Sequence, residues 1–196
     1  SYIPVSYHGD TTEGNKQDYS LVSISRLIET KDVQTAVKSM QYLPGKASLD
    51  VYGDGPRLPR LQGLAEEIGV SDQVSFKGRV PNEELLERLP DYDALVHPAS
   101  FDPIGFVVLE AMANSLPVVV SEGAGSSGYV DQGGNGYVVE PGDARGLAEG
   151  VKDVMASKKD MGDRSRKLIE TEFSVEASRK RLNNIIERAK SNQHRS

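Results

Sequence analysis

The amino-acid sequence predicts an α/β fold: a doubly wound parallel sheet followed by C-terminal helices. Short apolar runs alternate with amphipathic stretches from residue 19 to residue 139. Strands and helices that alternate at this spacing form right-handed βαβ units, which build a parallel sheet with helices on both faces. A chain of 196 residues with 37% hydrophobic and 27% charged residues has the size and the composition of one such domain.

The first half of the predicted sheet comes from three strand–helix pairs. Residues 19–24 form a short apolar run, and apolar residues then recur on one face of a helix over 32–43. The next two pairs are a strand over 47–52 with a helix over 58–68, and a strand over 73–77 with a helix over 83–89.

The second half begins in the same way and then changes to helices only. The apolar runs 94–97 and 118–121 lie on either side of a helix over 106–114, and 137–139 is the last strand. Two helices follow: one capped by Asp143 with Leu147, Val151, Val154 and Met155 on its apolar face, and one over 175–189 capped by Ser174.

We expect three parts along the chain: a polar interdomain linker over 1–18, the α/β domain over 19–173 and a C-terminal helix over 174–196. No apolar run reaches the roughly 20 residues of a membrane-spanning helix, and no leader sequence is evident. The absence of Cys suits a cytoplasmic protein. The net charge of −6 argues against a nucleic-acid partner, while the basic run 179–181 allows a weak peripheral contact with the inner face of an anionic membrane.

The residues that follow the strands are the candidate site, because ligands of open parallel sheets bind at the C-terminal ends of the strands. Arg26 and Lys31 follow the first strand, Gly53 begins a Gly-rich turn after the second, and Arg79 and Val80 follow the third. Basic side chains and Gly-rich turns at one edge of an acidic chain suit a phosphorylated ligand.

The loop after the fourth strand carries the most informative pattern. Gly105 begins a helix, so we expect the N–H groups of Gly105, Phe106 and Val107 to point outward, unpaired, at the positive end of the helix dipole. A pyrophosphate can bind there, with Arg26 and Lys31 as its countercharge.

Two carboxylates flank this expected phosphate site. Glu110 lies about 7.5 Å along the helix axis and precedes the small or apolar residues Ala111, Met112 and Ala113. A carboxylate at that depth is placed to accept two hydroxyl hydrogen bonds from a ribose. Asp102 is still in the loop and is expected near the group attached to the second phosphate.

With these residues in place, the sequence resembles a known family. The segment 102–119 (DPIGFVVLEAMANSLPVV) is similar to the acidic-x7-Glu motif of retaining GT-B glycosyltransferases of the large family 4 group. Five further pieces occur in the order of that family: Ser25-Arg26 with Lys31, 53–56, 74–80, Asn135-Gly136 and 141–143. The similarity runs from about residue 19 to 173 and implies a Rossmann-like half of a GT-B fold, the C-terminal nucleotide-sugar-binding domain, without its acceptor-binding N-terminal domain.

The resemblance implies roles in binding the nucleotide part of a donor. Arg26 and Lys31 hold the diphosphate, assisted by the amides of 105–107, and Glu110 binds the ribose. The backbone at Arg79 and Val80 contacts the base. Gly53 is either a ligand contact or simply a turn glycine that needs positive φ.

The resemblance also implies that Asp102 contacts the donor sugar, and here the sequence departs from the family. The first acid of the motif is normally Glu, which is one methylene longer than Asp102. Pro103 has no N–H and removes a potential donor to the sugar. His97, at the end of a strand, is interpreted as a structural histidine, and three His with no Cys give no convincing metal site.

The function that follows is the donor-binding domain of a retaining hexosyltransferase. The full-length enzyme would move a hexose from a nucleotide diphosphate sugar to a sugar or lipid-linked acceptor bound by the missing N-terminal domain, without cofactor or metal, and this chain alone is expected to be inactive. The alternatives within the fold are a nucleotide-sugar epimerase and a glucan synthase. A non-catalytic nucleotide-sugar-binding module is the alternative from another class, suggested by Asp102 and Pro103.

Overall fold

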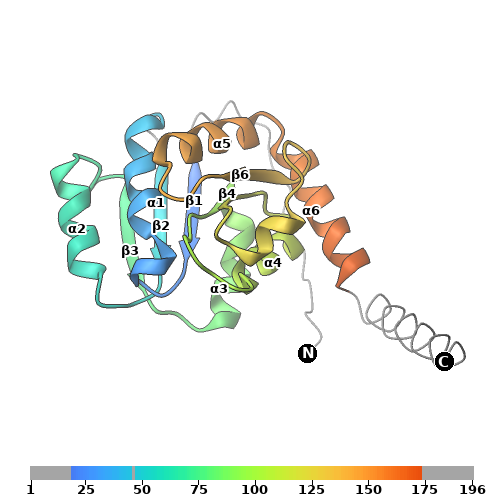
Figure 1. The fold of residues 1–196 in the computed structure, drawn as a ribbon, viewed down its shortest axis with the longest axis horizontal. Coiled ribbons are helices and arrows are strands. Elements are labelled where there is room, and N and C mark those ends of the chain that lie inside the picture. Colours follow the sequence, from blue (N-terminus) through green and yellow to red (C-terminus); the bar gives the residue numbers. More distant parts are fainter. Residues whose placement is uncertain (1–18, 46, 174–196) are drawn as a thin grey trace, which may run out of the picture.

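The computed structural model describes residues 19–45 and 47–173, and a six-stranded parallel sheet forms the centre of this part of the chain (Figure 1). The strands are β1 (Ser20–Ile24), β2 (Ser48–Tyr52), β3 (Val74–Gly78), β4 (Ala94–His97), β5 (Val118–Ser121) and β6 (Gly136–Val139). All neighbouring pairs are parallel, in the order β3-β2-β1-β4-β5-β6. The predicted doubly wound parallel sheet is confirmed. The predicted linker over 1–18 and the helix over 175–189 lie outside the described residues.

The strand order determines where a ligand can bind. From β1 the chain moves outward to β2 and β3, and it then returns to pair β4 with the other side of β1. The connections after β1 and β4 therefore leave the sheet in opposite directions. The crevice that such a divergence creates at the C-terminal ends of the strands is the usual ligand site of open α/β sheets.

Helices cover both faces of the sheet (Figure 1). They are α1 (Val33–Ser39), α2 (Leu58–Glu67), α3 (Asn82–Arg88), α4 (Phe106–Ala113), α5 (Ala144–Ala156) and α6 (Lys158–Glu172). Helices α1, α2 and α5 bury their apolar residues on one face, and α3 and α4 bury theirs on the other. Helix α6 packs against α4.

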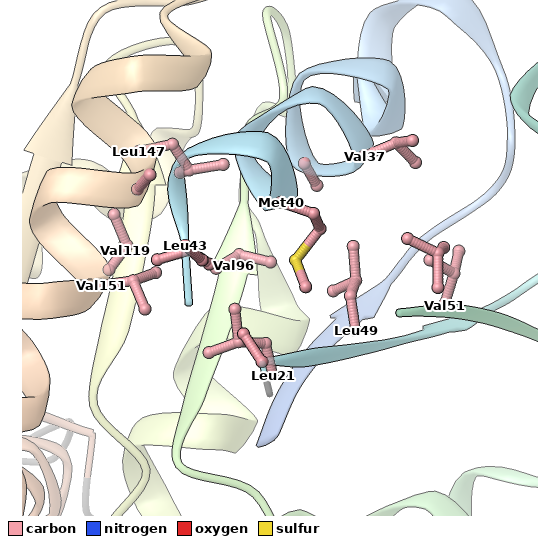
Figure 2. Close-up of a cluster of buried hydrophobic side chains, with 14 of the residues drawn as sticks. Leu21, Val37, Met40, Leu43, Leu49, Val51, Val96, Val119, Leu147 and Val151 are labelled. Carbon is pink, nitrogen blue, oxygen red and sulfur yellow. The ribbon is translucent and has the colours of Figure 1, made fainter. Parts of the chain in front are cut away.

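Figure 2 shows the larger of the two apolar clusters, in which side chains of α1 and α5 meet side chains of the central strands. Successive strand residues point to opposite faces: Leu49 and Val51 of β2 belong to this cluster, whereas Tyr52 belongs to the cluster beneath α3 and α4. The central strands β4 and β5 are buried on both faces and appear in the sequence as continuous apolar runs, whereas the edge strand β3 alternates Val74 and Phe76 with the exposed Ser75 and Lys77.

The structure moves several predicted boundaries by one to four residues. The helix predicted over 32–43 ends at Ser39 and continues as a 3-10 turn over Met40–Tyr42. The helix predicted over 83–89 ends at Arg88, and a 3-10 turn that contains Pro90 follows, because proline cannot donate the next helical hydrogen bond. The predicted cap of α5 is confirmed, since Asp143 Oδ1 accepts a hydrogen bond from the N–H of Gly146 at 2.8 Å.

Helix α6 was not predicted as a separate element, because it lacks a recognisable apolar stripe. Its buried residues are Met161, Gly162 and Ser165. Ser165 donates a hydrogen bond to the carbonyl of Asn135 at 3.0 Å, and a Cβ at Gly162 would collide with the carbonyl oxygen of Ser115. This close approach through small residues leaves little hydrophobic periodicity in the sequence. Across residues 19–45 and 47–173, the helices are all too short or too polar to span a membrane.

Candidate functional site

A pocket of about 490 Å³ opens at the C-terminal ends of β1, β2 and β3. Apolar and aromatic side chains line the pocket together with polar residues and glycines. The first group is Ile24, Tyr52, Val80 and Leu85, and the second is Ser25, Arg26, Gly53, Asp54, Gly55 and Arg79. Both Arg26 and Arg79 are exposed to solvent. Apolar side chains beside two guanidinium groups suit a ligand that joins a ring to an anionic group.

Two glycines bring the loops of this pocket together. A Cβ at Gly53, which has a φ of +130°, would collide with the carbonyl oxygen of Ser25, and one at Gly55 would lie 2.5 Å from the carbonyl oxygen of Leu27. Backbone hydrogen bonds join the same loops, among them Leu27 N–H to Asp54 O at 2.9 Å. Gly53 therefore lines the pocket and also holds its shape, so both readings of this glycine fit its position.

A second group of side chains is centred on Asp102. Its Oδ2 lies 2.7 Å from Lys31 Nζ and 2.9 Å from His97 Nε2, and its Oδ1 accepts the N–H of Gly105 at 3.2 Å. Hydrogen bonds from His97 and Lys31 hold the pKa of the Asp102 carboxyl well below its usual range, although partial burial acts in the opposite direction. The carboxylate is therefore ionised at neutral pH and accepts all three hydrogen bonds.

The start of α4 matches the predicted phosphate site only in part. Gly105 is the N-cap with φ +67°, and a Cβ there would collide with Ser126 Oγ. The prediction that the Gly105 N–H is unpaired is wrong, because Asp102 accepts it. The N–H groups of Phe106 and Val107 have no hydrogen-bond partner within the described ranges, so two of the three expected amides face outward at the positive end of α4.

Glu110 is half-buried in the middle of α4, and Ala111, Met112 and Ala113 behind it are buried as expected. Burial raises the pKa of the Glu110 carboxyl, and a hydrogen bond with the side chain of Asn82 opposes this rise. Asn82 is the first residue of α3 and follows the loop that carries Val80 of the pocket. The carboxylate of Glu110 therefore lies beside the β3–α3 connection.

The structure divides the predicted site residues between neighbouring groups. Arg26, Gly53, Arg79 and Val80 line the pocket; Lys31, Asp102 and Gly105 form the Asp102 group; and Phe106, Val107 and Glu110 lie on α4. Arg26 and Lys31 thus stand in different groups, although one loop carries both. That loop is joined to the β4–α4 loop, since the carbonyl of Thr30 accepts the Phe101 N–H at 3.1 Å and the Ser100 hydroxyl at 3.3 Å.

Sequence reasoning missed three residues at these groups. His97 was interpreted as structural, and it is buried, but its Nε2 contacts Asp102 directly. Tyr52 lines the pocket and Asn82 contacts Glu110, and neither belongs to a motif. The alternation of side chains along β2 could have placed Tyr52 opposite Val51, on the face that leads to the pocket. In the part of the chain that the structure describes, no group of three or more His, Cys, Asp or Glu side chains could hold a metal ion.

Comparison with known proteins identifies relatives for most of the chain. Residues 10–175 match the family described as "Glycosyl transferases group 1". The lipopolysaccharide core biosynthesis glycosyltransferase LpsE of Rhizobium meliloti is 31% identical over 160 residues, which are 80% of this chain and 46% of that protein. Glycogen synthase of Mycobacterium tuberculosis is 33% identical over 139 residues, 69% of this chain and 33% of that protein. The chain thus spans less than half the length of these curated relatives.

Solved protein structures share this fold. The structure of HepE from Anabaena in complex with UDP superposes with a TM-score of 0.77 at 20% identity, over 87% of this chain and 49% of that one. Further structures of that protein contain UDP with glucose, and UDP-glucose. By the family match and by its Rossmann-like fold, this chain belongs to the glycosyl transferases group 1 family and is a GT-B-type C-terminal domain.

Proposed function

We propose that this chain is the donor-binding domain of a retaining glycosyltransferase that transfers a hexose from a nucleoside diphosphate sugar. The observation that carries the proposal is the pocket of about 490 Å³, lined by apolar side chains and two arginines, at the same edge of the sheet as the outward-facing amides of α4. The UDP and UDP-glucose complexes of HepE support a nucleotide sugar as the ligand of this fold.

The proposed arrangement uses each group for one part of the donor. The base lies against Val80 and Leu85 in the pocket, and the half-buried Glu110 accepts hydrogen bonds from the ribose hydroxyls. The diphosphate lies between Arg26 and the start of α4, within reach of Lys31. Asp102 stands where the hexose is attached to the second phosphate.

The chemical task of such a domain is to stabilise the nucleoside diphosphate as it leaves. Negative charge develops on the phosphate oxygens when the glycosidic bond breaks, and fixed positive groups aimed at that position lower the barrier. Arg26, Lys31 and the N–H groups of Phe106 and Val107 supply these groups from the chain itself, so we propose that no metal ion is needed. Transfer also requires the acceptor within about 3–3.5 Å of the donor in a site closed to water. In the proposal, a part of the enzyme outside this chain binds the acceptor, a sugar or a lipid-linked sugar.

A panel of nucleoside diphosphates tests the proposal. Thermal-shift measurements followed by calorimetry with UDP, GDP, ADP and dTDP should give one preferred nucleotide, and its affinity should be unchanged by EDTA. Affinity that disappears in EDTA and returns with Mg²⁺ or Mn²⁺ would contradict metal independence. If the chain binds none of the nucleotides, the donor-binding role itself is wrong.

A second candidate function is a glucan synthase, in which the acceptor is the end of an α-glucan chain. The 33% identity with a glycogen synthase over 69% of this chain favours it among the alternatives. The two functions share the donor site and differ in the acceptor. Transfer of labelled hexose by the full-length protein to oligoglucans, compared with transfer to a lipid extract, distinguishes them.

A further inference from the structure

We propose that His97 is a positioning residue of the donor site, which acts by fixing the carboxylate of Asp102 and, through it, Lys31 and the first turn of α4. The inference rests on the proposed function, in which Lys31 and α4 bind the phosphates of the nucleotide sugar. His97 lies at the end of β4, on the central part of the sheet, and is 1% exposed. It is therefore in place before any ligand arrives.

The hydrogen-bond geometry defines which atom carries the proton. Asp102 is ionised, because its hydrogen bonds with His97 and Lys31 stabilise the charged form, and an ionised carboxylate can only accept. The contact of 2.9 Å between His97 Nε2 and Asp102 Oδ2 is therefore an N–H donated by the imidazole. The buried ring allows this N–H one direction only, so the position of Oδ2 is set by the sheet.

The fixed Asp102 carboxylate in turn constrains two groups that the nucleotide sugar needs for binding. Lys31 donates one of its three N–H bonds to Oδ2 at 2.7 Å, which leaves the other two for phosphate oxygens. The opposite oxygen, Oδ1, accepts the N–H of Gly105 at 3.2 Å and so holds the residue that begins α4. A single carboxylate thus connects β4, the loop after β1 and the helix whose free amides face the ligand.

The fold would tolerate other residues at this position as far as packing is concerned. An apolar side chain of similar volume would fill the space of His97 without a buried polar group. Without the N–H from His97, however, Asp102 would have Lys31 and Gly105 as its remaining donors, and both belong to loops rather than to the sheet. The carboxylate and the lysine could then move together, which would weaken contacts to a bound phosphate.

The test compares two amide variants, His97→Gln and His97→Asn. The side-chain nitrogen of Gln reaches about as far as Nε2 of His, whereas that of Asn reaches only as far as Nδ1, so Gln can restore the hydrogen bond and Asn cannot. Calorimetry with the preferred nucleoside diphosphate should give an affinity within about twofold of wild type for His97→Gln and about tenfold lower for His97→Asn. Inorganic pyrophosphate should follow the same order, and the corresponding nucleoside should bind all forms alike.

A control and a second measurement make the result independent of folding. Ser39→Ala also removes a buried hydrogen-bond donor. Because the Ser39 hydroxyl is bonded within α1, this variant should leave all affinities unchanged. In the wild-type chain, long-range ¹⁵N–¹H NMR of the imidazole should show the Nε2–H form. The Nδ1–H form, equal nucleotide affinity of the Gln and Asn variants, or a nucleoside affinity that falls with that of the diphosphate would overturn the inference. Failure of wild type to bind any nucleotide would instead overturn the proposed function.

Discussion

Replacing Asp102 with Asn tests whether one carboxylate holds together the loops at the switch point of the sheet. In the native structure it accepts hydrogen bonds from Lys31, His97 and the N–H of Gly105, at 2.7, 2.9 and 3.2 Å. Asn is almost the same size, but it is neutral and offers one oxygen and one NH₂ group. At least one of the three donors must then face another donor.

The expected loss of stability follows from these contacts. A hydrogen bond to a charged group contributes about 1.5–3 kcal/mol, and a buried donor left without a partner costs about 1–3 kcal/mol. The side chains of Lys31 and Asp102 are 18% and 15% exposed, so water screens part of the ion pair. We expect Asp102→Asn to lower the free energy of unfolding by about 2–3 kcal/mol, and the melting temperature by about 4–12 °C.

The pH dependence separates the effect of the charge from that of the shape. Folding lowers the pKa of the Asp102 carboxyl, so the unfolded state binds this proton more readily than the native state. The charge therefore stabilises the fold above the ordinary carboxyl pKa of about 4, and this stabilisation is lost as the pH falls towards the lowered value. The difference between wild type and Asp102→Asn should be constant between about pH 5 and 8 and should shrink below about pH 4.

Urea denaturation followed by circular dichroism at about pH 7 and about pH 3.5 measures both effects. Asp72→Asn, which changes an exposed carboxylate in the turn before β3, is the matched control and should stay within about 0.5 kcal/mol of wild type. A loss below about 0.5 kcal/mol for Asp102→Asn at neutral pH, or a difference that grows as the pH falls, would refute the role of the carboxylate as the junction.

Three further predictions concern the pocket and the reaction. Glu110→Gln should weaken binding of the nucleoside diphosphate by about 1–3 kcal/mol in calorimetry, because charged hydrogen bonds to two hydroxyls become neutral ones. The affinity for pyrophosphate should stay unchanged, and an equal loss for pyrophosphate would assign Glu110 a structural role. Gly53→Ala should destabilise the fold by about 2–3 kcal/mol, since the new Cβ collides with Ser25 O, whereas Gly63→Ala, in open space on α2, should be neutral or stabilising by denaturation. The chain alone should bind its nucleotide sugar but transfer no hexose to acceptors in a cell extract; transfer at the rate of the full-length enzyme, measured with a labelled donor, would contradict a separate acceptor-binding part.

The central strands β4 and β5 could be predicted well because burial on both faces leaves a simple signal. Residues 94–97 and 118–121 were predicted with the bounds that the structure shows, since each is an apolar run that begins after Asp93 or Pro117 and ends where side chains meet solvent or the site. Helix α6 could not be predicted in this way. Its buried residues are Met161, Gly162 and Ser165, and two of these three are small residues that let backbones approach but add little to an amphipathic pattern.

The candidate site could be predicted as a set of residues but not as an arrangement. Motif spacing pointed to Lys31 and Asp102 separately, and His97 was interpreted as structural; only the sheet brings the ends of β1 and β4 side by side. Which N–H groups the Asp102 carboxylate accepts depends on the direction of its side chain. The sequence therefore predicted the Gly105 N–H as free for a phosphate, whereas Asp102, three residues earlier, accepts it. Local side-chain-to-backbone hydrogen bonds of this kind are common for Asp and compete with ligand contacts.

The arrangement around Asp102 joins the two groups of residues that we propose to bind one ligand. The pocket lies over β1, β2 and β3, whereas the free amides belong to α4, on the other side of the switch point. The loop after β1 contributes Arg26 to the pocket and Lys31 to Asp102, and Thr30 between them binds the loop after β4 through two hydrogen bonds. A phosphate that contacts Arg26 and the amides of α4 would therefore bridge two loops that are already joined. Because these contacts exist before binding, little conformational entropy remains to be lost when a charged ligand arrives.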